Sequence, residues 1–411
     1  MSIYAGIFNT TQNPTQLNAR SFAGTILRRR PNGSAPLFGM TAMTGDSKAK
    51  ASTHGYFSKT MVFSQAVMAA TALVGDTALT VVSTAGLVKG MVLQNLRTNE
   101  TVRILTVTSA TVLTVTRQFG RIAAAAVNNG DTWIAIGNAH EEGSPRPAAR
   151  SIQAVYVPNF TQIWRNAWAL TDTARASYAE QGYSNISESK RDCMDFHSID
   201  IESSLFWGQP YMSTVNGQPI HATQGIVDAI RQYAPTNVDA APAETSYDDI
   251  VDMLLPCWKY ATDVGDPTTR VAFCDTTAMR VMQDIGKEYG EVSLTQKETS
   301  YGMKFSEFRY FKGSLMLKEH PLFNGIGVTP GTMVIVDVPA VKMAYMDGRK
   351  TISESYQPSS GGSNEMGNGV DAQGGSITTE AAVELINPAG CGVITNLIKA
   401  KPRIHYTKEV I

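Results

Sequence analysis

The sequence predicts an α+β fold that contains a small inserted all-β domain. Three observations support this prediction: a long helix pattern at about 186–207, a series of short strand patterns between 73 and 139, and alternating strand patterns in the last third of the chain. The chain has 411 residues, of which 43% are hydrophobic, so it can bury more than one core. At about 100–200 residues per domain, this length suggests two to four domains.

Charge and cysteine usage argue against several classes of protein. The 35 basic and 36 acidic residues give a net charge of -1. The chain therefore lacks the excess of positive charge that is typical of a dedicated nucleic-acid-binding protein. The four cysteines are scattered without paired or metal-type spacing, which is typical of reduced thiols in a cytoplasmic product. We see neither a signal-peptide pattern nor the run of about 20 apolar residues that a membrane helix requires.

Residues 1–50 show no sustained helix or strand period, and their one charged cluster is Arg28, Arg29 and Arg30. A segment of this kind cannot bury enough of itself to fold alone, so it is either a disordered tail or an arm ordered against a partner. Because the chain is nearly neutral, we favour exposed or inter-subunit ion pairs over nucleic-acid contacts for the arginines. We expect removal of residues 1–45 to leave a folded subunit that cannot assemble.

Two extended patterns, at 52–68 and 151–165, flank a self-contained β pattern. Turn signals at intervals of about 8–12 residues separate its strand patterns, as in a small barrel or sandwich. The expected strands are 79–82, 91–93, 102–107, 112–116 and 132–136. We interpret the whole as a long hairpin with a β domain inserted near its tip; an independent N-terminal β domain is the alternative.

The long helix at 186–207 has both a start and a stop signal. Asn185 and Glu188 have the spacing of a capping box, Gly208 is expected to take the left-handed conformation, and Pro210 prevents continuation. Its apolar residues do not form one stripe, so it is either the central core helix of an enzyme or a helix that contacts its own domain on one side and other subunits on another. Four carboxylates are spread around the helix, so we expect them to form surface or inter-subunit ion pairs. They are Asp192, Asp195, Asp200 and Glu202.

The following segment has an α/β pattern. Helical stripes are predicted behind Thr223 and behind Ser246, the second with a kink at Pro256, where a backbone hydrogen bond is lost. A strand at 270–274 leads into a helix that Asp275 is expected to cap.

Strands dominate the end of the chain. Residues 341–345 and 381–385 alternate, which predicts a sheet with one exposed face that carries Glu380, Ala382 and Glu384. A loop rich in Gly, Ser and Asn is expected from 358 to 375, and a last strand at 393–398.

No motif predicts catalysis. The six histidines are dispersed without metal-ligand spacing, and neither a nucleophile elbow nor a phosphate-binding loop is present. Asp275 is the best enzyme-like position, since ligands favour strand-to-helix junctions, but an Asp there is ordinarily an N-cap. We therefore predict no catalytic, cofactor or metal residue and favour a structural role.

The order of elements and several motifs resemble the major capsid protein of tailed bacteriophages. Lys190-Arg191-Asp192, Glu202 and Leu205-Phe206-Trp207-Gly208 are similar to the spine-helix signature of one branch of these proteins, and Thr223-Gln224-Gly225-Ile226 to the segment that follows it. The stretches 334–337, 341–346 and 379–388 resemble its C-terminal strands. The resemblance covers most of residues 150–400.

This resemblance implies the Hong Kong-type capsid fold, to which the β domain is an addition. Its parts would be an N-terminal arm (1–50), an extended hairpin loop (51–71 and 140–184), the inserted β domain (72–139), a peripheral domain with the spine helix (185–222 and 340–388) and an axial α/β domain (223–339 and 389–411). The loop at 358–375 would be the turn of the peripheral domain, where neighbouring capsomers meet.

The function implied is self-assembly, as pentamers and hexamers, into the icosahedral head shell around double-stranded DNA. The chain would assemble in the host bacterial cytoplasm, contact portal, scaffold and decoration proteins, and touch DNA weakly, without cofactor or membrane. Expected inter-subunit contacts are Arg28, Arg29, Arg30, Lys59, Lys190, Arg191, Asp192, Glu202 and Glu365. A phage tail or adhesion protein, and an α/β enzyme with an accessory β domain, remain alternatives.

Overall fold

The computed structural model describes residues 35–60, 63–171, 173–174, 185–259, 268–289, 295–298, 304–325, 328–356 and 372–401. Arg28, Arg29, Arg30 and Glu365 lie outside them, as does most of the predicted loop at 358–375. The chain divides into two compact units, residues 57–156 and the remainder.

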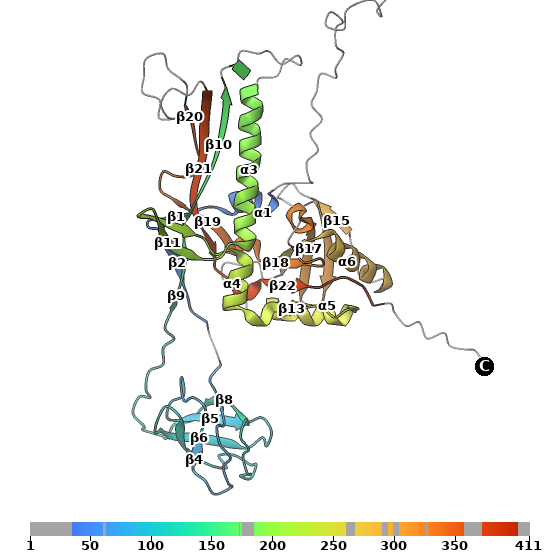
Figure 1. Ribbon diagram of the computed structural model, residues 1–411. Helices are drawn as coiled ribbons and strands as arrows, with labels where there is room; N and C mark the ends of the chain where they lie inside the picture. The colour runs from blue at the N-terminus through green and yellow to red at the C-terminus, as the bar shows by residue number, and fades with distance from the viewer. Residues whose placement is uncertain are drawn as a thin grey trace, which may run out of the picture. The chain divides into compact units, whose positions relative to one another are not determined.

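Residues 57–156 contain an antiparallel sheet around their own core (Figure 1). The sheet order is β3-β8-β5-β6-β7-β4, formed by β3 (Gln65–Val67), β4 (Ala78–Thr80), β5 (Met91–Asn95), β6 (Thr101–Val107), β7 (Val112–Thr116) and β8 (Thr132–Asn138). All five predicted strands are confirmed. The assignment of residues 65–67 to the flanking hairpin is wrong, because β3 pairs with β8 and buries Ala66 in this core.

The position of β3 leads to a prediction about fragments of the chain. A fragment of residues 63–140 should show a cooperative thermal melt by circular dichroism. A fragment of residues 72–139 should not, because it lacks β3 and the buried side chains of Ala66 and Met68. Equal melting of the two fragments would show that β3 does not contribute to this core.

The two predicted extended stretches form a separate two-stranded sheet. β2 (Thr53–Ser58) pairs with β9 (Val155–Phe160), and the N–H of Thr161 donates to the carbonyl of Ser52 at 2.8 Å.

The predicted long helix is confirmed as α3 (Asn185–Trp207), which runs beside β10 (Gln162–Thr171) (Figure 1). Asn185 belongs to the helix itself. The expected left-handed conformation of Gly208 is wrong, because Gly208 has no positive φ. A Cβ on Gly208 would lie 2.5 Å from the carbonyl oxygen of Thr223, so glycine is needed here for close backbone approach.

One five-stranded sheet packs against α3. Its order is β1-β19-β21-β10, with β20 paired to β21, formed with β1 (Ser47–Ala49), β19 (Val341–Met346), β20 (Ile352–Tyr356) and β21 (Ala372–Leu385). Because β21 begins at Ala372, residues 372–375 belong to a strand and not to the predicted loop. The predicted exposed face is also wrong: Ala382 is fully buried with Ala49 and Ala344, and Glu380 is 9% exposed.

A second sheet carries the α/β pattern. Its order is β13-β22-β18-β14-β17-β16-β15, formed by β13 (Val238–Ala240), β14 (Thr269–Cys274), β15 (Thr295–Glu298), β16 (Lys304–Tyr310), β17 (Gly313–Glu319), β18 (Met333–Val336) and β22 (Gly392–Thr395). The associated helices are α4 (Ile226–Tyr233), α5 (Tyr247–Leu254) and α6 (Thr276–Tyr289). The last strand is thus shorter than the predicted 393–398.

The predicted helix signals in this part of the chain are largely confirmed. Ser246 and Asp249 form a capping box at the start of α5. At Pro256 the α-helix does not kink; it has ended at Leu254, and a 3-10 turn follows. The 3-10 turns are η1 (Pro235–Asn237), η2 (Leu255–Trp258), η3 (Pro321–Asn324), η4 (Val338–Ala340) and η5 (Pro388–Gly390).

The end of the expected arm is folded within the subunit. Helix α1 (Pro36–Thr44) buries Leu37 and Met40 completely in the main core, and β1 pairs in parallel with β19. The expectation that this arm lacks a partner inside its own subunit is therefore wrong for residues 36–49. The signal was weak because α1 is short and its apolar residues show almost no helical periodicity.

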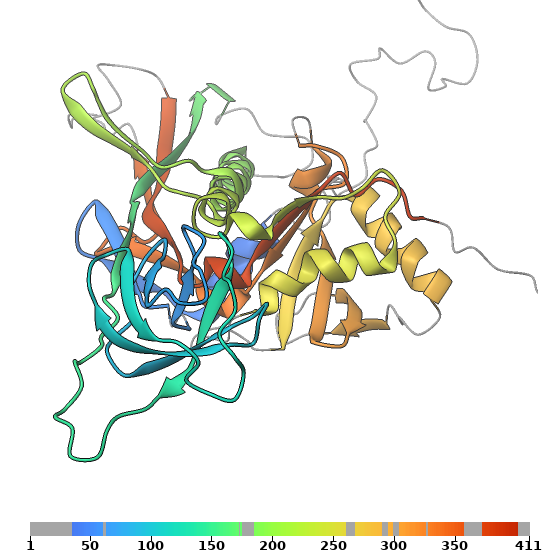
Figure 2. The ribbon, with the colours of Figure 1, turned by 90° about the horizontal axis from the view of Figure 1, so that it is seen from below.

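A small hairpin connects α3 to α4. It consists of β11 (Tyr211–Val215) and β12 (Gln218–Ala222), and Figure 2 shows it as a yellow-green ribbon that extends away from the end of α3. None of the described helices is long and apolar enough to cross a membrane.

Candidate functional site

The residues that looked most enzyme-like have structural roles. Asp275 uses both carboxylate oxygens on backbone N–H groups, from Ala278 at 2.7 Å and Gly331 at 2.8 Å, which confirms it as the N-cap of α6. Among the described residues, no group of three His, Cys, Asp or Glu side chains could hold a metal ion.

Burial raises the pKa of Cys257 and of Cys391 to about 12, so both remain thiols at neutral pH.

The best-defined polar site in the larger unit lies where α1 meets α3. The carboxylate of Glu202 accepts hydrogen bonds from the backbone N–H groups of Leu37 (2.8 Å) and Phe38 (2.7 Å). These N–H groups belong to the first turn of α1, whose N-cap position holds Ala35, a residue without a capping side chain. Glu202 therefore caps α1 from another helix, with its negative charge at the positive end of the helix dipole.

His320 completes this site. Its Nδ1 accepts from the backbone N–H of Leu322 at 3.2 Å, so Nε2 carries the proton and donates to Glu202 at 2.8 Å. The imidazole stacks on Phe323 and meets the edge of Phe206. Glu202 and His320 are both completely buried.

These contacts connect α1, α3 and η3 at one point. The prediction that Glu202 contacts another subunit is wrong, because its carboxylate is enclosed and its hydrogen bonds are all made inside its own subunit. The sequence signal that was missed is the alanine at the N-cap of α1, which leaves first-turn N–H groups in need of an acceptor.

The other predicted contact residues on α3 are exposed. Lys190 places its Nζ 4.9 Å from the ring centroid of Trp168, a cation–π contact, while Arg191 and Asp192 face solvent. Lys59, in the smaller unit, is also exposed. Within the larger unit, the hydrogen bonds of Glu202 go to Leu37, Phe38 and His320 and not to these residues of α3.

The side chains of α3 differ widely in exposure. Cys193, His197 and Ile201 are buried, and His197 bridges Asn166 and Thr379 through its two ring nitrogens. Burial lowers the pKa of His197. Met194 and Phe196, by contrast, are 50% and 62% exposed, which is unusual for large apolar side chains on a helix.

The acidic side chains of β21 have partners from distant segments. Glu384 accepts from the hydroxyl of Ser47 at 2.5 Å and lies 3.1 Å from Nε2 of His54, while Glu380 pairs with Arg349 at 2.6 Å. These contacts explain why β21 has no exposed face.

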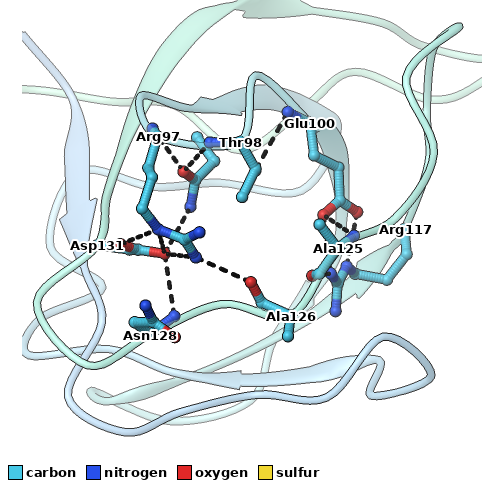
Figure 3. Close-up of polar contacts among 9 residues, drawn as sticks. Arg97, Thr98, Glu100, Arg117, Ala125, Ala126, Asn128 and Asp131 are labelled. Carbon is cyan, nitrogen blue, oxygen red and sulfur yellow. Dashed lines mark hydrogen bonds and ion pairs between the residues drawn. The ribbon is translucent and has the colours of Figure 1, made fainter.

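In residues 57–156, two arginines fix the loops at one end of the sheet (Figure 3). Arg117 forms two 2.7 Å bonds to the buried carboxylate of Glu100 and also donates to the carbonyls of Leu73, Asp76 and Ala125. Arg97 binds the carboxylate of Asp131 and the carbonyl of Ala126. Bidentate hydrogen bonds between an arginine and a carboxylate hold the loops in a single geometry.

The Asp131 contact makes this unit sensitive to acid. The Arg97 hydrogen bonds lower the pKa of Asp131 from 3.8 to about 2. The unfolded chain therefore takes up this proton first, so the stabilisation is complete above about pH 4 and is lost as the pH falls towards 2. We expect the melting temperature of a fragment of residues 57–156 to fall between pH 4 and pH 2, and to fall less in Asp131→Asn, as measured by circular dichroism. An identical fall in both would contradict this assignment.

Comparisons with known proteins identify similar chains. A family model described as the SU10 major capsid protein matches residues 9–398. The sequence is 61% identical over 416 residues to the major capsid protein of Pseudomonas phage PaMx41, and the match covers 99% of each chain. Among solved structures, a chain of the Cyanophage A-1(L) capsid asymmetric unit matches with a TM-score of 0.51 at 11% identity, covering 95% of this chain and 100% of that chain.

Proposed function

Because the chain belongs to the SU10 major capsid protein family, we propose that its copies assemble as pentamers and hexamers into a closed head around double-stranded DNA. The chain is the major capsid protein of a tailed phage, forms the icosahedral shell and has the Hong Kong-type capsid fold. The observation that carries the proposal is the near-complete match to a capsid protein at 61% identity.

The surface of the subunit supports self-association. Large apolar side chains are exposed on elements that a monomeric protein would ordinarily cover, including Phe57 at 72%, Phe196 at 62% and Met212 at 61%. Interfaces that are modest one by one become strong when each subunit forms several at once. The capsid family also has a structural role, and no described site favours the enzyme alternative.

The proposal assigns a role to each part of the chain. Residues 185–222 and 340–388 form the peripheral domain, and 223–339 with 389–411 form the axial domain. The hairpin strands β2 and β9 extend over a neighbouring subunit, and the N-terminal arm reaches another. Lys59, Lys190, Arg191 and Asp192, which are exposed in the subunit, form contacts between subunits, as do Arg28, Arg29, Arg30 and Glu365.

The proposal also names further partners. The shell assembles in the host bacterial cytoplasm with portal and scaffold proteins, and a decoration protein binds it from outside. A net charge of -1 suits a container that contacts its packaged DNA only weakly.

Electron microscopy of the purified full-length protein tests this function. We expect closed icosahedral particles of megadalton mass, in which pentamers and hexamers are resolved. A small soluble oligomer, or a tube or fibre under all assembly conditions, would refute the proposal and favour the enzyme or the tail protein.

A further inference from the structure

The β11–β12 hairpin has the properties of a rigid docking element. In the described part of the chain, β11 and β12 pair only with each other. An isolated two-stranded hairpin is marginally stable in water, so a hairpin of this kind needs other support.

Two features make this hairpin rigid. Its two-residue turn is Asn216-Gly217, both with positive φ (52° and 76°), which is the favoured turn for a tight hairpin. Its base is closed by a 2.8 Å hydrogen bond from the N–H of Gly225 to the carbonyl of Gly208. The hydroxyl of Thr223 adds a bond from the N–H of Val383 at 3.0 Å.

The strand register separates the hairpin into two faces. Met212 is opposite His221, and His221 stacks on Phe160 of β9 with 6.2 Å between ring centroids, so this face contacts the subunit at His221, while Met212 is 61% exposed. The other face, which we call the Tyr211 face, carries Tyr211, Ser213, Val215, Gln218, Ile220 and Ala222. Its large side chains are exposed: Tyr211 at 57%, Val215 at 54% and Ile220 at 47%.

The composition of this region indicates what covers the Tyr211 face. Residues 203–227 contain no Asp, Glu, Lys or Arg, although 17% of the whole chain is charged, which would give about four in such a stretch. Without cations the face does not suit nucleic acid, and depletion of charge with exposed Tyr is typical of the centre of a protein interface. In a shell of identical subunits, another copy of this chain is the most abundant protein next to each subunit, so we take a second copy as the partner of this face.

We propose that the Tyr211 face docks onto a second copy of this chain in the shell. This inference rests on the proposed function and adds an interface that lies on neither the N-terminal arm nor the β2–β9 hairpin. The unpaired backbone edges of β11 and β12 leave hydrogen-bonding groups available to the same neighbour.

A charge placed on this face tests the proposal. In the full-length chain, Ile220→Lys should reduce the yield of sedimenting particles at least tenfold relative to wild type, because the interface would then bury an unpaired charge. The thermal melt of the free subunit should be unchanged, since Ile220 is half exposed there. The matched control is Thr214→Lys, an exposed position on the opposite face of the same hairpin, with a yield within about twofold of wild type.

A second measurement identifies the neighbour and does not depend on Ile220→Lys folding. A photo-crosslinking amino acid at Tyr211 should give covalent dimers of the chain in particles and none in free subunits. Crosslinks to a different protein, absence of crosslinks in particles, or equal loss of yield in Ile220→Lys and Thr214→Lys would each overturn the inference. If wild type forms normal particles and Ile220→Lys gives the same yield, the docking of the Tyr211 face is refuted while the proposed function stands. If wild type forms no particles, the proposed function itself is refuted.

Discussion

The variant Glu202→Ala is expected to unfold with a free energy about 3–5 kcal/mol lower than that of wild type. The substitution leaves the N–H groups of Leu37 and Phe38 and the Nε2–H of His320 without an acceptor in a site closed to solvent. Each buried donor without a partner costs about 1–3 kcal/mol. Since domains are stable by only about 5–15 kcal/mol, urea denaturation of the free subunit should detect this loss readily.

Two further variants define the origin of this effect. Glu202→Gln keeps the shape and one acceptor oxygen, so its loss should be smaller, about 1–3 kcal/mol. Arg191→Ala, an exposed position on the same helix, should remain within about 0.5 kcal/mol of wild type. The double variant Glu202→Ala/His320→Ala should lose less than the sum of the single variants. A loss below about 1 kcal/mol in Glu202→Ala would mean that the site does not hold α1 in place.

The sequence predicts the elements whose signals are local. The helix at 186–207 and the caps at Ser246 and Asp275 depend on residues within one or two turns, and each was predicted close to its position. The role of Glu202 depends on Leu37 and His320, which lie 165 and 118 residues away. Nothing near Glu202 in the sequence distinguishes it from the exposed Asp192 on the same helix.

The same reason explains the errors in the sheets. An alternating pattern with Glu380 and Glu384 predicts an exposed face, but Arg349 and His54, both distant in sequence, cover these acids. Strand β3 was missed because three residues carry too little pattern to separate them from the extended stretch beside them. The faces of the β11–β12 hairpin follow from register and long-range packing, although its Asn216-Gly217 turn is a local hairpin signal.

Deletion of residues 1–45 is expected to abolish folding of the subunit, contrary to the prediction from sequence. The deletion removes α1 and with it Leu37 and Met40, both completely buried in the main core. Loss of a buried Leu or Met side chain costs about 2–5 kcal/mol, and Glu202 would lose the N–H groups that satisfy its carboxylate. Together these losses approach the whole stability of a domain. Circular dichroism should show no cooperative melt, and most of the expressed chain should be insoluble.

Deletion of residues 1–34 separates the fold from assembly. This variant keeps α1 and the Glu202 site, and the sequence it removes lacks a sustained apolar period, so its melting temperature should stay within about 4 °C of wild type. It should nevertheless fail to form closed particles by electron microscopy, because the arm proposed to reach another subunit is gone. Normal particles from this variant would show that the arm is not needed for assembly. A cooperative melt near the wild-type temperature in the 1–45 deletion would show that α1 contributes little to the core.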